Sequence, residues 1–370
     1  MNPMETLEKI VTDIVAPSAL DTDRESRFPR AAIKALGESG LLGLISAKEV
    51  GGLGGGLAEA SAVIRRIAQD CPSTAMVVCM HYCATSLIEK HGSEAVRRDI
   101  AAGRHLSTLA FSEAGSRSHF WAPMSSATAD GDEVVLDAAK SWITSAGEAD
   151  SYVWSSRPTT GERPCSLWLV PAATAGLEFS GGFDGLGLRG NASLPVRANG
   201  ARIPRSALLG EDGRGSDLMN AVLPWFASLN ASSSVGLMNG ALARACAHVG
   251  ATRYAHLGSS LADLPTIRAY LAKARIRTDQ AATLLDDTIA ALAAGREDAV
   301  LRVFQTKAAS AEAALYVTDT AMRVCGGAAF RKEAGVERLF RDARAASVMG
   351  PTSDVLYDFI GKIMLGLPIF

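Results

Sequence analysis

The sequence predicts an α+β multidomain fold with an N-terminal helical domain, a central β-barrel or β-sandwich, and a C-terminal four-helix bundle. Apolar residues recur at helical spacing up to about residue 104, and short alternating runs replace them between about residues 107 and 210. Long Ala-rich helical patterns then extend from residue 216 to the end. We therefore expect domains over residues 1–106, 107–212 and 213–370.

The first domain is predicted to be helical from its apolar spacing and its composition. The stretches "RAAIKALGESGLLGL" (residues 30–44) and "EASAVIRRIAQD" (residues 59–70) both show this spacing. They are rich in Ala, Leu and Glu, which are strong helix formers. The string "GGLGGG" (residues 51–56) interrupts the pattern and indicates a loop.

The central domain is predicted to be β-structure. Short alternating runs flank the turn-forming "DGD" within "SSATADGDEVVLDAAKSWITSAG" (residues 125–147). The strings "SLWLVPA" (residues 166–172) and "LPVRANGARIP" (residues 194–204) follow, and no pattern of helix length appears. Trp, Val and Thr are frequent here, as is typical of strands.

The C-terminal domain is predicted to be an antiparallel helical bundle. Its three longest patterns cover residues 218–255, 266–295 and 297–327, and Gly295 and Gly326 follow the second and third as helix-ending residues. The helices are rich in Ala, which allows close packing, and we expect their exposed apolar stripes to contact other subunits.

Composition excludes several classes of partner. The chain has 370 residues, 48% of them apolar, and a formal net charge of -2, which gives no general affinity for nucleic acid or for a membrane surface. No apolar run reaches the roughly 20 residues of a membrane span. The six cysteines show no metal-binding spacing, so we expect reduced thiols, no metal site and a cytoplasmic location.

Three strings in this order resemble signatures of the acyl-CoA dehydrogenase family. They are "LAFSEAGSRSHF" (residues 109–120), "DAAKSWITSAGEAD" (residues 137–150) and "RVCGGAAFRKEAGVERLFRDAR" (residues 323–344). The resemblance covers essentially the whole chain and implies the helical–β–helical fold of that family. It also implies an FAD-dependent oxidoreductase that acts on an acyl thioester, carried either by CoA or by an acyl-carrier protein.

The resemblance assigns five residues of the β domain to FAD. Phe111 and Ser112 match positions that contact the flavin ring, and Ser118 matches one that contacts the pyrophosphate. Trp142 offers a flat apolar face to cover the ring, and Thr144 a hydroxyl directed at its reactive nitrogen. The backbone N–H groups of a turn such as "FSEAGSRS" suit an anionic ligand.

Five further residues come from the C-terminal domain. Gly326 and Gly327 lack a Cβ, so a cofactor of another subunit can approach them closely, and Arg323 replaces the family's Gln with another hydrogen-bond donor. Thr352 and Asp354 match positions near the adenine ribose and the pyrophosphate. In the family this segment crosses a dimer, so the resemblance implies a homotetramer or a homodimer.

The usual catalytic base of the family is missing. The family's Glu position aligns with Gly350, which has no side chain, and Pro351 follows it. Some members carry the base on an earlier helix, but the matching residues 220–240 contain no Asp, Glu or His. His119, which follows the flavin-loop Ser, is the candidate for a substitute base.

Two family arginines are also missing. The segment "ATRYAHLGSSLADLP" (residues 251–265) is shorter than the family loop and lacks its Arg, which grips the partner's FAD diphosphate. Ala227 occupies the position of an Arg that approaches CoA. The loss of a charge-assisted bond of about 1.5–3 kcal/mol would weaken FAD binding roughly tenfold or more.

Three functions stay open at this point. The first is an acyl-thioester dehydrogenase with a relocated base, using an acyl-CoA or an acyl-carrier protein and an electron acceptor that the sequence does not name. The second is a flavin-dependent monooxygenase or desulfinase on the same fold. The third is a flavin-binding paralogue without catalytic activity.

Overall fold

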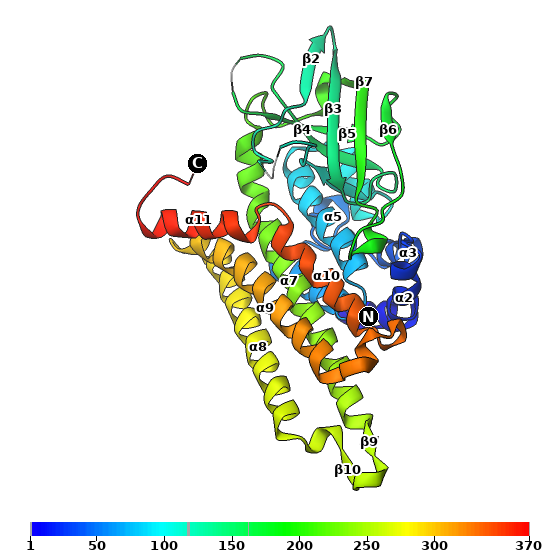
Figure 1. Cartoon of the computed structure of the whole chain (residues 1–370). Helices are drawn as coiled ribbons and strands as arrows, with labels where there is room; N and C mark the ends of the chain where they lie inside the picture. The colour runs from blue at the N-terminus through cyan, green and yellow to red at the C-terminus, as the bar shows by residue number, and fades with distance from the viewer. Residues whose placement is uncertain (1, 117–118, 162, 370) are drawn as a thin grey trace.

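The computed structural model describes residues 2–116, 119–161 and 163–369. It consists of an N-terminal group of helices, a β domain and a C-terminal group of long helices, which confirms the predicted fold class (Figure 1). The β domain lies at one end of the molecule, and the long helices α7 (Gly215–Ala251) and α8 (Pro265–Ala294) extend away from it to the hairpin at the opposite end. No helix in the described ranges is both long enough and apolar enough to span a bilayer.

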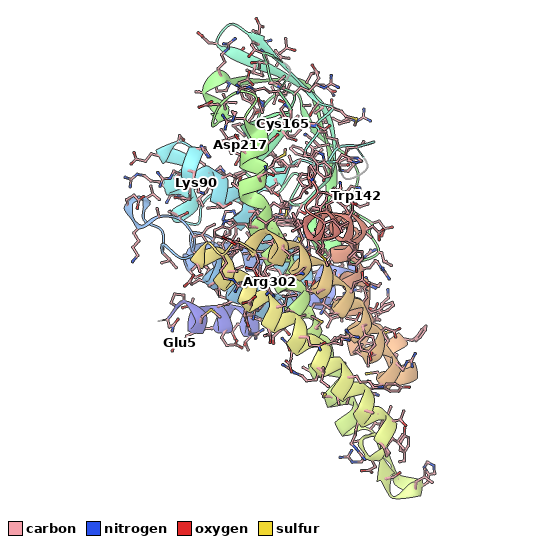
Figure 2. The ribbon with its side chains drawn as sticks, turned by 90° about the vertical axis from the view of Figure 1, so that its left-hand side faces the viewer. Glu5, Lys90, Trp142, Cys165, Asp217 and Arg302 are labelled. Carbon is pink, nitrogen blue, oxygen red and sulfur yellow. The ribbon has the colours of Figure 1, made fainter. Side chains whose placement is uncertain are left out.

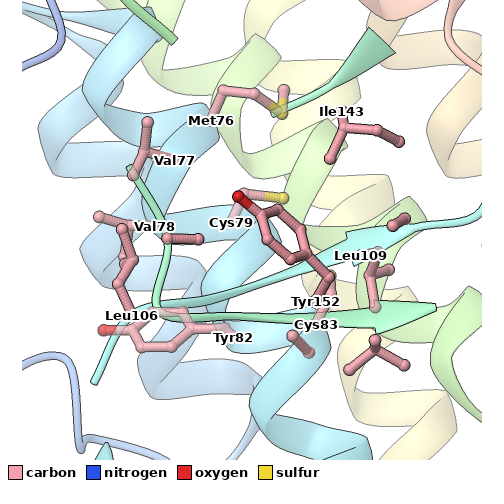
Figure 3. Close-up of a cluster of buried hydrophobic side chains, with 14 of the residues drawn as sticks. Met76, Val77, Val78, Cys79, Tyr82, Cys83, Leu106, Leu109, Ile143 and Tyr152 are labelled. Carbon is pink, nitrogen blue, oxygen red and sulfur yellow. The ribbon is translucent and has the colours of Figure 1, made fainter. Parts of the chain in front are cut away.

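The N-terminal part is built around one buried helix. Its helices are α1 (Pro3–Ile10), α2 (Ala16–Arg24), α3 (Arg30–Glu38), α4 (Leu57–Ala68), α5 (Pro72–His91) and α6 (Glu94–Ala101). Helix α5 is buried along most of its length and packs against the first strand of the β domain. Figure 3 shows Met76, Cys79 and Tyr82 of α5 beside Leu109 and Tyr152 of the strands. This apolar contact joins the first two domains.

The β domain consists of two four-stranded sheets. The first has the order β1 (Ser107–Ala110), β4 (Ser151–Ser156), β5 (Ser166–Pro171), β8 (Leu208–Leu209), and only its β1–β4 pair is parallel. The second has the order β2 (Ser126–Asp130), β3 (Glu133–Ile143), β7 (Leu194–Pro204), β6 (Leu177–Phe179), and all its pairs are antiparallel.

An irregularity at the end of β3 sets up the site. Strand β3 pairs with β7, and the register shifts twice, between Leu136 and Ala138 and again between Lys140 and Ile143. Trp142 lies within the second shift with a φ of 58°, in the left-handed region that non-glycine residues seldom adopt. The shift lets the strand end turn its side chains away from the regular ladder.

The C-terminal part contains α7 (Gly215–Ala251), α8 (Pro265–Ala294), α9 (Ala299–Cys325), α10 (Val336–Val348) and α11 (Ser353–Met364). A short hairpin, β9 (Arg253–Tyr254) and β10 (Ser259–Ser260), joins α7 to α8. Helix α7 approaches α4 so closely at Gly236 that a Cβ there would lie 2.3 Å from the carbonyl oxygen of Arg65. The glycine at this position therefore permits the contact. Helix α11 runs across the ends of α8 and α9 in Figure 1.

The motif "ERLFRDAR" lies on α10 and forms structural ion pairs. Arg341 binds Asp23 of α2 at 2.6 Å and Glu337 of its own helix at 2.7 Å. Asp342 accepts a hydrogen bond of 2.6 Å from the backbone N–H of Leu188, and burial raises its pKa to about 6. These bonds tie the C-terminal helices to the other two domains.

Candidate functional site

A cavity of about 80 Å³ lies where the three domains meet. Helix α5 contributes Met80, the β domain contributes its aromatic wall, and α7 and the α10–α11 loop close the other side. The lining residues are Met80, Leu109, Phe111, Ser112, Phe120, Trp142, Ile143, Met219, Val222, Leu223, Phe226 and Gly350. The structure therefore brings four positions singled out from the sequence (Phe111, Ser112, Trp142 and Gly350) to one cavity.

A buried ion pair holds the loop that carries Phe111 and Ser112. The carboxylate of Glu113 lies 2.7 Å from the Lys140 ammonium, and both side chains are buried. Glu113 also accepts hydrogen bonds from the backbone N–H and hydroxyl of Ser125, which close the loop. Lys140 donates to the carbonyl oxygen of Ser155 at 2.7 Å. Loop and strand β3 are thus fixed relative to each other at the cavity.

Burial and ion pairing act in opposite directions on the pKa of each member of this pair. Burial lowers the pKa of Lys140 to about 8, although the charge of Glu113 counteracts it. Burial raises the pKa of Glu113, but the Lys140 charge and the hydrogen bonds from Lys140, Ser125 and Met124 outweigh it, so the pKa lies below its ordinary value. The pair is therefore charged at neutral pH, with each charge compensating the other.

Trp142 and Thr144 have different environments. The indole of Trp142 is 71% exposed, lines the cavity and meets the ring of Phe183 edge to face at 6.4 Å. In Figure 2 it lies where the β domain meets the C-terminal helices. Thr144 is buried, and its hydroxyl lies 3.3 Å from that of Ser193. Trp142 is thus available to a ligand in the cavity, whereas the buried Thr144 is not among the lining residues.

Gly350 and the helical stretch 220–240, where the resemblance predicts the family's base, both contribute residues to this cavity. Gly350 lines it, and so do Val222, Leu223 and Phe226 from the helical stretch 220–240. Within the described part of the chain, the lining includes no Asp, Glu, His, Lys, Arg, Tyr or Cys. The site as built from these residues can enclose an apolar group and offer hydroxyl, indole and backbone hydrogen bonds, but it holds no side chain able to remove a proton at neutral pH.

His119 does not reach the cavity. Its imidazole is exposed, its Nδ1 lies 2.9 Å from the carbonyl oxygen of Ser116, and its ring meets that of Trp121 edge to face at 5.2 Å. Phe120, its neighbour, lines the cavity instead. Ser118, the predicted pyrophosphate contact, lies outside the described residues.

The remaining predicted cofactor residues lie away from the cavity lining. Arg323, at the end of α9, stacks over the ring of Tyr270 at 5.3 Å, and Gly326 and Gly327 follow it on the surface. Thr352 caps the N-terminus of α11 through a hydrogen bond from Val355 N–H, and Asp354 is exposed in the first turn. The group of Arg323, Gly326 and Gly327 and the group of Thr352 and Asp354 therefore lie at two separate places on the chain.

Several residues of the site were not predicted from the sequence. Met80, Phe120 and Phe226 line the cavity but come from three different domains, and each matches an ordinary core position in its own pattern. The Glu113–Lys140 pair was likewise missed. A signal was present, since a Lys at an inward position of an alternating strand requires a buried partner.

The residues present fit a flavin. Trp142, Phe111 and Ile143 offer apolar surface to a flat ring, and Ser112 offers a hydroxyl beside them. The loop that carries Phe111 and Ser112 is anchored by the Glu113–Lys140 ion pair, whose charges compensate each other, and not by a free charge. A neutral, aromatic-lined wall with a few polar groups suits an uncharged ring system.

Comparison with known proteins agrees with this architecture. The N-terminal, middle and C-terminal domain models of acyl-CoA dehydrogenase match residues 4–103, 108–200 and 213–365. The mitochondrial short-chain specific acyl-CoA dehydrogenase of Bos taurus is 32% identical over 349 residues, which cover 92% of this chain and 83% of that protein. Cyclohex-1-ene-1-carbonyl-CoA dehydrogenase of Geobacter metallireducens is 26% identical, with coverage of 98% and 97%.

Solved structures share the fold at lower identity. The glutaryl-coenzyme A dehydrogenase in complex with glutaryl-CoA superposes with a TM-score of 0.92 at 24% identity and covers 99% of this chain and 95% of that chain. The prolyl acyl carrier protein oxidase AnaB superposes with a TM-score of 0.88 at 19% identity and covers 98% of each chain.

Proposed function

Because this chain belongs to the acyl-CoA dehydrogenase family of oxidoreductases, we propose that it binds FAD at the three-domain cavity and acts there on the CH–CH bond of an acyl thioester. The observation that carries the proposal is the meeting of Phe111, Ser112 and Trp142 with Gly350 in one apolar cavity. When bound, FAD supplies the acceptor for two electrons, and the protein supplies enclosure and orientation.

Each wall of the cavity has a separate task in this proposal. Trp142 and Phe111 would cover the ring, and the hydroxyl of Ser112 would offer it a hydrogen bond. Met80, Leu223 and Phe226 exclude water from the acyl group by apolar contact. The loop with Ser112 stays in place because the Glu113–Lys140 pair anchors it.

The carrier of the acyl group is either CoA or an acyl-carrier protein. Ala227, which is buried on α7, offers no charge to a CoA phosphate at that position. A carrier protein delivers its thioester through a protein–protein contact and does not need that particular arginine. Thioesters of CoA and of an acyl-carrier protein should therefore be compared as substrates in the same assay.

A homotetramer or homodimer completes the proposed FAD site. Arg323, Gly326 and Gly327 lie on the surface, and the neighbouring Phe330 is 86% exposed. An exposed aromatic side chain beside a pair of glycines is well suited to contact a second subunit. Light scattering should show a dimer or tetramer at micromolar concentration, and a stable monomer that still holds flavin would contradict this part of the proposal.

The direct test uses the purified full-length protein incubated with FAD. We expect flavin to stay bound through gel filtration and to be released on denaturation. Under anaerobic conditions, a panel of acyl-CoA and acyl-carrier-protein thioesters is then added, and bleaching of the flavin absorbance identifies a substrate. A protein that takes up no FAD would overturn the proposal.

A second function is favoured by one observation. The described lining residues include no acid or base, which suits a flavin-dependent monooxygenase or desulfinase because neither reaction begins with removal of an α-proton by the protein. Formation of an oxygenated thioester product, on addition of chemically reduced flavin and O₂, would favour the monooxygenase, since free reduced flavin consumes oxygen by itself. Hydrolytic release of sulfite from a thioester that carries a sulfinate group would favour the desulfinase.

A further inference from the structure

The C-terminal bundle contains one lysine whose charge is buried without a carboxylate. Lys307, on α9, is fully buried, and it forms no salt bridge within the described ranges. Its ammonium donates to three backbone carbonyl oxygens, those of Ala346 at 3.1 Å, Met349 at 3.1 Å and Pro351 at 2.8 Å. Three N–H donors are thus matched to three acceptors, which offsets part of the desolvation cost of the ammonium.

Two of these acceptors flank the residue that lines the cavity. Met349 and Pro351 lie on either side of Gly350, and Ala346 belongs to the last turn of α10. The final carbonyls of a helix have no partner within the helix and favour a nearby cation. Lys307 therefore binds the end of α10 and the loop after it as one unit.

Lys307 also contacts the opposite helix of the site. Its Nζ lies 5.9 Å from the centroid of the Phe226 ring on α7, and Phe226 lines the cavity. From the same helix, the Asn230 amide donates to the sulfur of Met349 at 3.4 Å. Side chains of both α7 and α9 thus bind the loop that contains Gly350. Lys307 itself does not line the cavity.

The effect falls on the backbone of Gly350. Because this residue has no side chain, only its backbone can form the cavity wall at that point. Neither its N–H nor its carbonyl takes part in a hydrogen bond among the described residues, while the carbonyls before and after it bind Lys307. The backbone N–H and carbonyl of Gly350, a residue that lines the cavity, thus have no protein partner within the described ranges.

We propose that Lys307 is a positioning residue, which fixes the Gly350 segment and the Phe226 ring and so determines the shape and hydrogen-bonding groups of that cavity wall. The proposal deepens the function proposed above and rests on it for the identity of the ligand. The position of the loop itself can be measured without any ligand. Burial lowers the pKa of Lys307 to about 7, as is expected for an ammonium that lacks a counter-ion.

The test compares Lys307→Met with Lys307→Arg and with the control Lys273→Met in the full-length protein. Methionine keeps the length and apolar stem but donates no hydrogen bond, arginine keeps the charge and donors, and Lys273 is an exposed lysine of α8. Hydrogen–deuterium exchange is measured on the peptide that covers residues 345–356. We expect about tenfold faster exchange there in Lys307→Met, with the rest of α7 and α9 unchanged, and partial rescue in Lys307→Arg.

A second measurement links the loop to the cavity. Each variant is loaded with FAD, and the dissociation constant of butyryl-CoA is measured from the change in the flavin spectrum. A loosened Gly350 wall should weaken that binding about tenfold or more in Lys307→Met, while the affinity for FAD itself changes less. Lys273→Met should match the unmodified protein in both measurements.

The possible outcomes separate the proposals. Unchanged exchange at residues 345–356, or faster exchange spread evenly over the whole bundle, would overturn the positioning role. Local loosening without any effect on butyryl-CoA binding would overturn the link to the cavity. If the unmodified protein binds no FAD, the proposed function fails, but the exchange data still decide whether Lys307 holds the loop.

Discussion

The ammonium of Lys140 lies 2.7 Å from the carboxylate of Glu113, and neither side chain reaches solvent. The pair connects strand β3, which carries Trp142 next to its last residue, to the loop that begins with Phe111 and Ser112. Two walls of the cavity are therefore held by one interaction. Its removal should affect both the stability of the fold and the shape of the site.

The Glu113–Lys140 pair leads to a prediction on stability. Replacing Lys140 by Met leaves the Glu113 carboxylate buried without its partner, which should cost about 3–5 kcal/mol of unfolding free energy. The double variant Lys140→Met/Glu113→Gln should recover part of that loss, because no charge is left unpaired. Urea denaturation measures both. As a control, Arg202→Met breaks exposed pairs with Asp130 and Glu133 and should leave the unfolding free energy nearly unchanged.

Trp142 leads to a prediction on cofactor binding. Truncation to Ala removes an exposed indole from the cavity and should weaken FAD binding by on the order of 1 kcal/mol, or roughly fivefold in dissociation constant. Quenching of flavin fluorescence on titration of the apoprotein measures this change. The control Met4→Ala removes an exposed apolar side chain from α1, outside the cavity lining, and should leave the dissociation constant unaltered. Equal affinities of Trp142→Ala and the unmodified protein would place the flavin elsewhere.

His81 leads to a prediction on pH. It is fully buried on α5; its Nε2 lies 3.1 Å from the carbonyl oxygen of Leu42, and its Nδ1 accepts from the backbone N–H of Ser107 at 3.1 Å. Burial lowers its pKa from 6.5 to about 4, so the unfolded chain binds a proton there at pH values where the folded chain does not. Its contribution to stability is therefore present above about pH 6.5 and is lost as the pH falls towards 4, by roughly 3 kcal/mol in total.

The variant His81→Gln tests this account, since Gln can still hydrogen-bond but does not titrate. Unfolding free energies from urea denaturation are compared at neutral pH and near pH 5. The unmodified protein should lose more stability over this range than the variant, by about 1–2 kcal/mol. Parallel pH profiles of the two proteins would mean that His81 does not contribute to the acid sensitivity.

The sequence predicted the fold well because periodicity and family strings report on local structure. The strand pattern over residues 194–204 coincides with β7, and the long Ala-rich patterns coincide with α7, α8 and α9. The cavity was predicted only in part, since Phe226 and Met80 match ordinary core positions until the domains are assembled. Lys307 was not predicted, because a single lysine on a helix is usually solvated and its three acceptors are backbone atoms.

Gly350 leads to the last prediction, which concerns the absent base. If the cavity lacks a base, the unmodified protein should be reduced only slowly by saturated acyl-CoA, and a carboxylate at residue 350 should help. General-base catalysis contributes typically ~10²–10⁴-fold, so Gly350→Glu should gain about 10²-fold in the rate of anaerobic flavin reduction by butyryl-CoA or octanoyl-CoA. Because Pro351 restricts the loop, the double change Gly350→Glu/Pro351→Gly should gain more.

The control for this prediction is Val348→Glu, which places a carboxylate two residues away on the exposed side of α10. It should leave the reduction rate unchanged, because the new group does not reach the cavity. Fast reduction by the unmodified protein would show that a base exists outside the described lining, and His119 would then be the first residue to replace. If both Gly350→Glu forms stay slow while they still bind FAD and butyryl-CoA, the acid–base account of this cavity is wrong. The monooxygenase or desulfinase function would then explain better why the wall at Gly350 consists only of backbone.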